Sequence, residues 1–191
     1  MTRIIGGLAG SLRLTSPAKA TRPTSDRIRE SIFSRLDARD AITDARVLDL
    51  YAGTGALALE AISRGASVAV LVDKDGKAAA VCKQNSLLVE KAMRKNDVEV
   101  SIRVQHQAVT AYLSAVTDKF DLVFIDPPYE VSNSEVSANL QALLGCLNSA
   151  ATVIVERSSR GEKLQLPEGF VLDEIKNYGD TDTYWLSTSA S

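Results

Sequence analysis

The sequence predicts an α/β fold in which helices cover both faces of a doubly wound, mostly parallel sheet. From residue 46 to residue 155, short apolar segments of strand type alternate with segments of helix type. The first of these strands leads through the glycine turn Ala52-Gly53-Thr54-Gly55 into a helix. A later strand, 120–125, ends in Asp126-Pro127-Pro128-Tyr129, where two prolines stop the strand and hold polar groups at its carboxyl end.

Residues 1–40 are predicted to form a basic N-terminal extension, composed of a hairpin and a helix. Segments 4–7 and 11–14 are typical of a short hairpin around a glycine-rich turn. Thr24 or Ser25 is expected to cap the helix, whose apolar stripe consists of Ile28, Ile32, Phe33 and Leu36. The remaining residues, 41–191, are expected to form one larger domain.

The larger domain is predicted to contain seven strands. They are expected at 47–51, 67–72, 98–104, 120–125, 152–155, 170–175 and 183–187. Helices are expected at 56–64, 77–90, 109–116 and 136–147. The last two strands are predicted to pair as a hairpin across the turn Gly179-Asp180, so the sheet is parallel except at this end.

Composition fits one domain, or one domain with a small appendage. The chain has 191 residues, of which 45% are hydrophobic and 24% are charged. Two distant cysteines, Cys82 and Cys146, indicate a reducing compartment, and a single histidine, His106, excludes a His-based metal cluster. No apolar segment approaches the roughly 20 residues that span a bilayer. We therefore expect a cytoplasmic protein with no metal and no membrane partner.

The net charge of −2 conceals an uneven distribution. Residues 1–35 carry a net charge of +5, and the remainder carries −7. A basic arm on an acidic body is a common arrangement for contacting nucleic acid phosphates, although a solvated basic surface is an alternative explanation. The candidate RNA contacts are Arg3, Arg13, Arg22, Arg27 and Arg29.

The glycine turn is a candidate cofactor site. Gly53 and Gly55 lie where a strand becomes a helix, so the backbone can approach a ligand and the helix N-terminus offers unpaired N–H groups. With Ala58 the turn also fits the loose Gly-x-Gly-x-x-Ala pattern of dinucleotide enzymes, so an NAD-dependent oxidoreductase is one alternative. Asp49 favours another nucleoside ligand, because its carboxylate would repel a pyrophosphate but attract a cationic amino acid group.

Asp73 ends the second predicted strand, where its carboxylate is placed to bind ribose hydroxyls. A ligand with adenosine at one end and an ammonium-bearing amino acid at the other is S-adenosylmethionine (SAM). SAM is therefore the predicted cofactor. The further candidate contacts are Tyr51, Ala52, Thr54, Lys74 and Asp126, with Gln107 and Ala108 as an adenine contact.

The candidate catalytic residues are Asp126, Pro127, Pro128 and Tyr129, at the sheet edge where open α/β folds bind ligands. An exocyclic amino group of a nucleobase is a poor nucleophile, because its lone pair is delocalised into the ring. The Asp126 carboxylate and the Pro127 carbonyl are acceptors that could hold such a group, and Tyr129 could stack on the base. The motif thus predicts direct methyl transfer driven by positioning and local electrostatics.

Segments 49–57 and 126–129 together resemble class I SAM-dependent amino-methyltransferases, which have a Rossmann-like fold. Arg3-Ile4-Ile5-Gly6-Gly7, segment 22–30 and Tyr178-Gly179-Asp180-Thr181 narrow the resemblance to the RsmD family. That family methylates the N2 amino group of a guanine in 16S ribosomal RNA. The resemblance covers nearly the whole chain, and segment 22–30 is its discriminating part.

The resemblance implies SAM contacts at Gly53, Gly55, Asp73 and around Ala108, and target-amine contacts at 126–129. It implies S-adenosylhomocysteine as product and small-subunit RNA, either naked or with bound ribosomal proteins, as substrate. We expect the protein to be a monomer. Two positions depart from the family pattern: Asp73 stands where many relatives carry Glu, and Gln107 replaces a smaller or different polar residue.

Three alternatives remain open at this point. A DNA adenine-N6 or cytosine-N4 methyltransferase uses the same proline-rich acceptor motif, although such enzymes usually add a base-reading region for which this chain has little room. The NAD-dependent oxidoreductase remains the second alternative. A non-catalytic RNA-binding domain that kept the fold is the third, and it predicts that SAM is not turned over.

Overall fold

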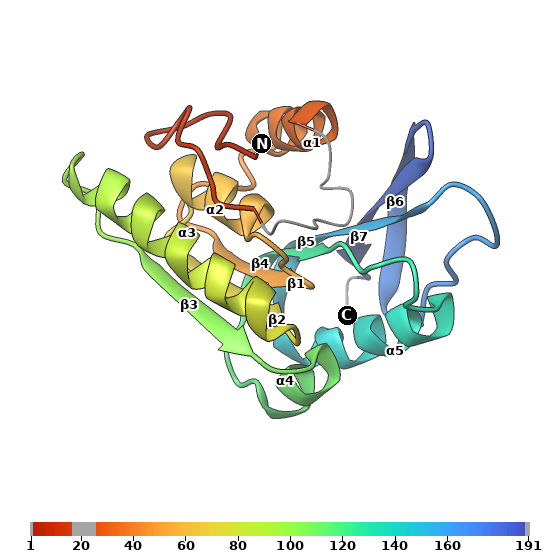
Figure 1. The fold of residues 1–191 in the computed structure, drawn as a ribbon. Helices are drawn as coiled ribbons and strands as arrows, with labels where there is room; N and C mark the ends of the chain where they lie inside the picture. The colour runs from red at the N-terminus through yellow and green to blue at the C-terminus, as the bar shows by residue number, and fades with distance from the viewer. Residues whose placement is uncertain (1, 17–25, 190–191) are drawn as a thin grey trace.

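The computed structural model describes residues 2–16 and 26–189, which form one seven-stranded sheet with helices on both faces (Figure 1). The strands are β1 (Arg46–Leu50), β2 (Val68–Asp73), β3 (Ser101–His106), β4 (Phe120–Ile125), β5 (Leu147–Ser158), β6 (Phe170–Tyr178) and β7 (Thr181–Thr188). The helices are α1 (Asp26–Ala38), α2 (Ala56–Ser63), α3 (Gly76–Arg94), α4 (Val109–Ala115) and α5 (Asn133–Leu143), and a single 3₁₀ turn, η1 (Leu144–Cys146), follows α5.

The strand order is β3-β2-β1-β4-β5-β7-β6. Strands β1 to β5 are parallel, whereas β7 runs antiparallel to both of its neighbours, β5 and β6. The predicted doubly wound sheet, parallel except for a terminal hairpin, is confirmed. Strands with near-continuous Val, Leu, Ile and Phe suit this position, because a parallel sheet is buried on both faces.

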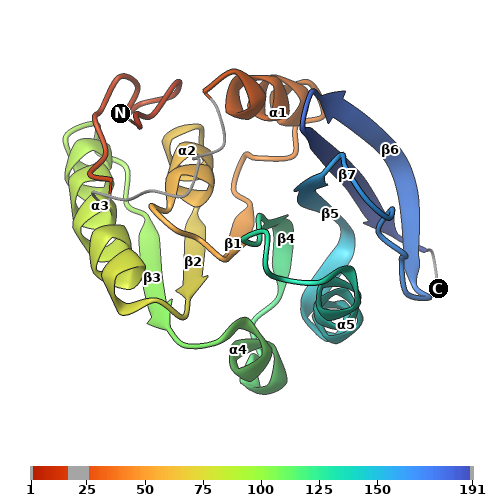
Figure 2. The ribbon, with the colours of Figure 1, turned by 45° about the vertical axis from the view of Figure 1, so that its right-hand side comes forward.

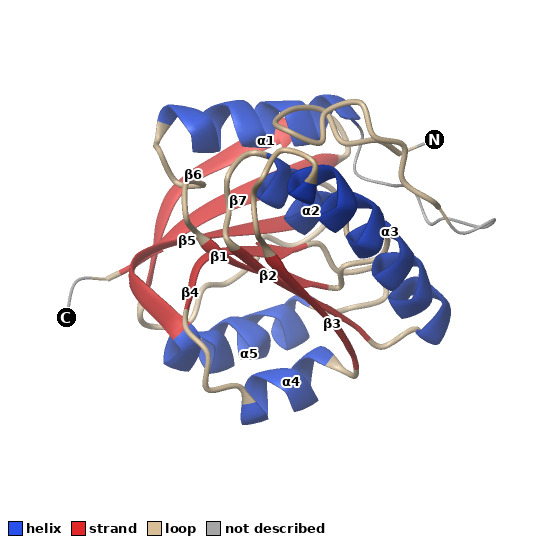
Figure 3. Ribbon diagram, turned by 90° about the vertical axis from the view of Figure 1, so that its left-hand side faces the viewer, coloured by secondary structure: helices blue, strands red, loops and turns tan. Residues whose placement is uncertain are grey.

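Two apolar layers cover the sheet. Helices α1, α2 and α3 lie on one face, and α4 and α5 lie on the other (Figures 2 and 3). The alternation of side chains along β1 and β4 divides the core: Val47 and Phe124 point to the first layer, while Leu48 and Val123 point to the second. All four side chains are buried.

Several element boundaries differ from the predicted ones. Helix α3 continues four residues beyond the expected end at Glu90, because Met93 is fully buried and anchors its last turn. Helix α5 begins and ends earlier than the predicted 136–147. Strand β5 is much longer than 152–155, because β7 pairs with it as far as Ser158 and an irregularity in its pairing with β4 lets it begin at Leu147.

The predicted N-terminal hairpin forms as a short antiparallel pairing around an Arg3–Arg13 bridge. The backbone N–H groups of Ile4, Ser11 and Leu14 donate to the carbonyls of Leu12, Ile4 and Thr2, each at 2.9 Å. The segment is also held by α2, where the buried Glu60 carboxylate accepts hydrogen bonds from the backbone N–H groups of Ile5 (2.6 Å) and Gly6 (2.8 Å). Backbone packing is so close that a Cβ at Gly7 would lie 1.9 Å from the carbonyl oxygen of Ser63. Segment 2–16 therefore packs as part of the core layer.

Helix α1 covers the end of the sheet that carries β6 and β7. The guanidinium groups of Arg35 and Arg39 lie 4.8 and 5.2 Å from the ring centroid of the buried Trp185. The hydroxyls of Ser31 and Tyr178 share a 2.6 Å hydrogen bond. The predicted helix caps, Thr24 and Ser25, lie outside the described residues.

None of the helices in residues 2–16 and 26–189 combines the length and apolar character that a bilayer crossing requires. Both cysteines, Cys82 and Cys146, are free and buried.

Candidate active site

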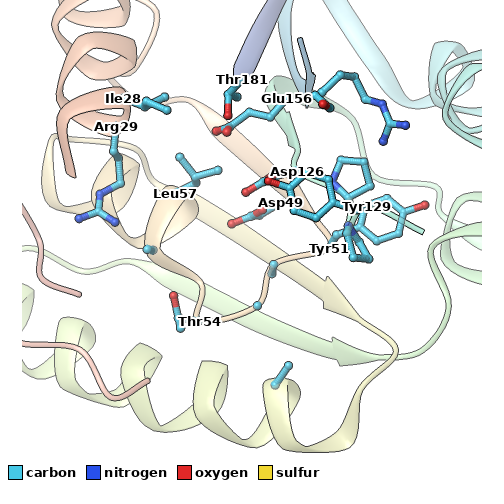
Figure 4. A pocket seen from close by; sticks show the side chains of 18 of the residues that line it. Ile28, Arg29, Asp49, Tyr51, Thr54, Leu57, Asp126, Tyr129, Glu156 and Thr181 are labelled. Atoms are coloured by element: carbon cyan, nitrogen blue, oxygen red, sulfur yellow. The ribbon is translucent and has the colours of Figure 1, made fainter. Parts of the chain in front are cut away.

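The candidate site lies at the switch point of the sheet, between β1 and β4, where the order of the strands reverses. From β1 the chain continues to β2 and β3 on one side, and then returns to place β4 and β5 on the other side. The carboxyl ends of β1 and β4 thus border a crevice, the position at which open α/β sheets bind ligands. A cleft of about 1370 Å³ opens there, lined by the glycine turn, the ends of β2, β4 and β5, the β6–β7 turn and α1 (Figure 4).

The glycine turn is built from residues in the left-handed region. Tyr51, Gly53 and Gly55 have φ values of 64°, 57° and 78°. A Cβ added at Gly53 would meet no heavy atom closer than the Tyr51 carbonyl oxygen at 4.0 Å. Gly53 also lines the cleft, so a ligand can approach its backbone closely.

Gly55 has a different role from the predicted one. It does not line the cleft among the described residues, and a Cβ there would lie 2.5 Å from Leu71 Cδ2 and 3.5 Å from the Cys82 sulfur. Its missing side chain therefore makes room for the core and not for a ligand. A contact between the Gly55 backbone and the cofactor stays a prediction, whereas the space beside its Cα is taken by the core.

Asp49 is a buried carboxyl group at the floor of the cleft, with 1% of its surface exposed. Its Oδ2 accepts a 3.1 Å hydrogen bond from the Ala58 N–H in the first turn of α2. Burial raises the pKa of Asp49 to about 8, an effect that the Ala58 N–H opposes and the nearby Asp126 and Asp73 carboxylates reinforce. A cation bound beside Asp49 would favour its ionised form.

Asp73 joins the end of β2 to the glycine turn. Its Oδ2 accepts a 2.9 Å hydrogen bond from the Gly53 N–H, and its Oδ1 accepts one of 2.8 Å from the Asp75 N–H. The Gln107 N–H donates to the Asp73 carbonyl at 3.1 Å, which brings the start of α4 beside this corner.

Most of the predicted cofactor residues meet at the cleft. Those that line it are Asp49, Tyr51, Ala52, Gly53, Thr54, Asp73, Lys74 and Asp126. Gly55, Gln107 and Ala108 do not line it among the described residues, although Gln107 is adjacent to Asp73.

The loop after β4 forms another wall of the cleft. Asp126, Pro127, Pro128 and Tyr129 all line it, and Figure 4 shows the Asp126 and Asp49 side chains side by side. The Tyr129 side chain is 69% exposed, which leaves its ring available for stacking. Arg157 fixes the following loop, because its guanidinium donates to the Val131 carbonyl (2.8 Å) and to Asn133 Oδ1 (2.9 Å).

The candidate RNA-binding arginines occupy different environments. Arg27 is exposed and lines the cleft, and Arg3 and Arg13 are exposed on the N-terminal segment. Arg29 is buried, with its guanidinium donating to the Arg3 carbonyl (2.6 Å) and Asp26 Oδ1 (2.8 Å). Burial lowers the pKa of Arg29. A phosphate contact by Arg29 does not fit this position, and Arg22 lies outside the described residues.

Two further polar residues near the cleft were not predicted from the sequence. Glu156, 6% exposed, lines the cleft directly after the apolar segment 152–155, so it carries the same signal that singled out Asp126. The buried Asn85 of α3 donates to the carbonyls of Thr15 (3.0 Å) and Thr54 (2.9 Å) and accepts from the Thr15 N–H (2.8 Å). A helical asparagine gives no comparable signal.

Comparisons with known proteins match almost the whole chain. A family model described as conserved hypothetical protein 95 matches residues 2–187. Ribosomal RNA small subunit methyltransferase D of Escherichia coli K12 is 34% identical to this chain over 178 residues, which cover 93% of this chain and 85% of the relative. The chain belongs to the RsmD family.

Solved structures agree with this membership. A hypothetical protein of Thermus thermophilus superposes on this RsmD-family chain with a TM-score of 0.80 at 30% identity, over 98% of this chain and all of the other. Magnesium protoporphyrin IX methyltransferase of Synechocystis PCC 6803, solved with bound SAM, superposes with a TM-score of 0.64 at 16% identity, over 85% of this chain and 79% of the other. The latter similarity shows the fold alone, which is that of class I SAM-dependent methyltransferases.

Proposed function

We propose that this RsmD-family protein transfers a methyl group from SAM to the exocyclic N2 amino group of a guanine in 16S ribosomal RNA. One observation carries the proposal: the Asp126-Pro127-Pro128-Tyr129 loop and the glycine turn face each other across a single cleft at the carboxyl edge of the sheet. Groups that could hold a target amine thus lie opposite groups that could hold a methyl donor.

The residues around the glycine turn fit SAM. Asp73 and Lys74 would hold the ribose, the Gly53 backbone would permit close approach of the ligand, and Asp49 would face its ammonium group. The raised pKa of Asp49, about 8, means that a bound cation would compensate a carboxylate that burial otherwise destabilises. When bound, SAM supplies a methyl group on a sulfonium, which is a good electrophile.

The loop after β4 would position the amine. The Asp126 carboxylate and the Pro127 carbonyl would accept hydrogen bonds from its N–H groups, so that the nitrogen lone pair points into the cleft. Tyr129 would stack on the base taken out of its helix, which its exposed ring permits. These groups would supply orientation and charge stabilisation, and Asp126 could receive the departing proton.

The arrangement disfavours the NAD-dependent alternative. A dinucleotide pyrophosphate normally binds backbone N–H groups at the helix N-terminus. Here the Gly53 N–H donates to Asp73 and the Ala58 N–H donates to Asp49, so two of these donors already serve carboxylates. An ionised Asp49, at the floor of the cleft, would also repel a diphosphate.

Family membership supports ribosomal RNA as the substrate, since the E. coli relative is named a ribosomal RNA small subunit methyltransferase. Arg27, exposed at the rim of the cleft, is placed for a phosphate contact. We include in the proposal that the protein acts in the cytoplasm as a monomer.

The direct test incubates the protein with labelled SAM and with unmodified small subunits, free 16S RNA or DNA. Mass spectrometry of the digested nucleic acid then identifies the methylated nucleoside. N2-methylguanosine from either RNA substrate supports the proposal, and comparison of the two substrates shows which form is used. Methylated adenine or cytosine in DNA would instead favour a DNA amino-methyltransferase, and no transfer to any substrate would favour a non-catalytic protein.

A further inference from the structure

Glu156 lies next to Asp126 on the face of the sheet that borders the cleft. Ile125 of β4 is in register with Val155 of β5. Asp126 and Glu156 directly follow these two residues, Asp126 just beyond the end of β4 and Glu156 within β5. Adjacent strands are about 4.8 Å apart, and side chains in register point to the same face. Figure 4 shows both carboxylate side chains entering one cleft.

The surroundings hold Glu156 in place. It is 6% exposed, and on its other side it is in register with Thr183 of β7, which is fully buried. The next residue, Arg157, is fixed by its hydrogen bonds to Val131 and Asn133. The Glu156 side chain therefore leaves a strand whose position is set on both sides, which suits a residue that recognises a fixed hydrogen-bonding pattern.

Guanine differs from adenine and cytosine in the ring nitrogen that lies next to its amino group. Its N1 carries a hydrogen, so N1–H and the N2 amino group present adjacent donors. In adenine and cytosine the amino group instead lies beside an unprotonated ring nitrogen, which is an acceptor. An ionised carboxylate only accepts hydrogen bonds, so it would attract the guanine edge and repel the edge of adenine or cytosine.

We propose that Glu156 determines base specificity by accepting a hydrogen bond from guanine N1–H while Asp126 and the Pro127 carbonyl hold the N2 amino group. This inference rests on the proposed function. A carboxylate offers about four acceptor sites, so the contact with N1–H is compatible with other hydrogen bonds to Glu156. Glutamine in its place would keep the volume but could present an N–H to the ring nitrogen.

The test compares target RNA that carries guanine with the same RNA carrying 2-aminopurine at the methylated position. 2-Aminopurine keeps the N2 amino group, but its N1 is an acceptor. We expect the wild-type protein to use guanine with the higher kcat/KM, and the Glu156→Gln variant to reduce the guanine-to-2-aminopurine ratio roughly 10- to 100-fold. Glu168→Gln, which removes an exposed carboxylate outside the cleft lining, should leave the ratio unchanged.

A second variant, Glu156→Asp, keeps a carboxylate with a shorter reach, and it should turn over more slowly yet still prefer guanine. If Glu156→Gln does not fold, the wild-type protein still tests the inference, because equal kcat/KM values for guanine and 2-aminopurine would overturn it. An unchanged ratio in a folded Glu156→Gln variant that binds SAM would also overturn it. Failure of the wild-type protein to methylate guanine N2 at all would instead overturn the proposed function.

Discussion

The backbone N–H of Gly53 donates a 2.9 Å hydrogen bond to the Asp73 carboxylate, which joins the turn after β1 to the end of β2. The bond holds the turn in its left-handed conformation and fixes Asp73 at the rim of the cleft. The second oxygen of Asp73, Oδ1, accepts a hydrogen bond from the Asp75 N–H, so two backbone donors orient the carboxylate. A preorganised carboxylate of this kind suits the recognition of ribose hydroxyls.

Asp126→Asn should lower the rate of methyl transfer roughly 10²- to 10³-fold, because it replaces a charged acceptor that faces the reacting amine. SAM affinity should fall much less than the rate, since Asp126 is only one of the candidate SAM contacts and the glycine turn is untouched. Single-turnover kinetics and equilibrium binding would measure the two effects. Asp97→Asn is the matched control, because it removes an exposed carboxylate at a positive φ of 57°, which asparagine tolerates. Near-normal turnover of Asp126→Asn would contradict the assigned role.

Asp49 should make the protein less stable as pH rises. Its pKa is raised from 3.8 to about 8 in the folded protein, so the protonated form is favoured there and its stabilising effect is lost between about pH 4 and pH 8. Urea unfolding across this range should show a fall in stability that is smaller in Asp49→Asn. Identical pH profiles for the two proteins would show that Asp49 is not a buried carboxyl with a raised pKa.

The two glycines of the turn should respond differently to alanine. Gly53→Ala should weaken SAM binding, because its Cβ would occupy open space in the cleft that the ligand needs. It should lower stability by only about 1–2 kcal/mol, the cost of a left-handed φ for alanine. Gly55→Ala should lower stability by about 2–5 kcal/mol, because its Cβ clashes with Leu71 in addition to the φ strain. Thermal unfolding and SAM titration separate the effects. A Gly53→Ala variant with unchanged SAM affinity would count against a cofactor at this turn.

Asn85→Ala should lower stability by about 2–3 kcal/mol, because it leaves the Thr15 and Thr54 backbone groups without their side-chain partner. Asn85→Asp should be worse, since a carboxylate would face two carbonyl oxygens. The matched control is Asn96→Asp, at an exposed asparagine that donates to the Ala92 carbonyl, and it should cost less than about 0.5 kcal/mol.

Hydrogen exchange at the Thr15 amide gives a local measure of the same contact. The amide should exchange faster in Asn85→Ala than in the wild-type protein, because its acceptor has been removed. Unchanged protection at Thr15 would show that Asn85 does not hold the N-terminal segment.

Arg27→Glu should weaken RNA binding and reduce the slope of log K against log salt by about 1–2, because an exposed phosphate contact is lost and a repulsive charge is added. Its melting temperature should stay close to that of the wild type. Arg29→Gln should instead lower stability by about 2–3 kcal/mol, because the Arg3 carbonyl loses the buried guanidinium that donates to it. RNA titrations at several salt concentrations, with thermal unfolding of each variant, would distinguish the two arginines.

The sheet was predictable because the sequence of each central strand is a short apolar segment that is recognisable by itself. Segments such as 120–125 are apolar on both faces, which only a strand buried on both sides requires, and prolines 127 and 128 mark where β4 stops. The cleft followed from the fold class, since a parallel sheet places Asp49, Asp73 and Asp126 at one edge. The boundaries of α3 and β5 were not predictable, because burial of Met93 and pairing with β7 decide them.

Side-chain direction was the part that sequence could not supply. Gly53 and Gly55 are two residues apart and look alike in the sequence, yet one faces the cleft and the other faces Leu71. Arg27 and Arg29 likewise differ only in which side of the helix meets the core. Glu156 could have been found by the rule that selected Asp126, a polar residue directly after a buried strand.

The stacking of Arg35 and Arg39 on Trp185 joins α1 to β7, the last strand among the described residues. Because β6 pairs only with β7 within the described sheet, β6 has no strand partner until β7 has been synthesised. Helix α1 packs on earlier elements through Phe33, which contacts Phe124, but it lacks Trp185 until then. During translation the side of α1 that carries Arg35 and Arg39 therefore stays without Trp185 until β7 has emerged from the ribosome. A premature stop codon shortly before residue 181 would leave β6 without its strand partner and α1 without the Trp185 contact.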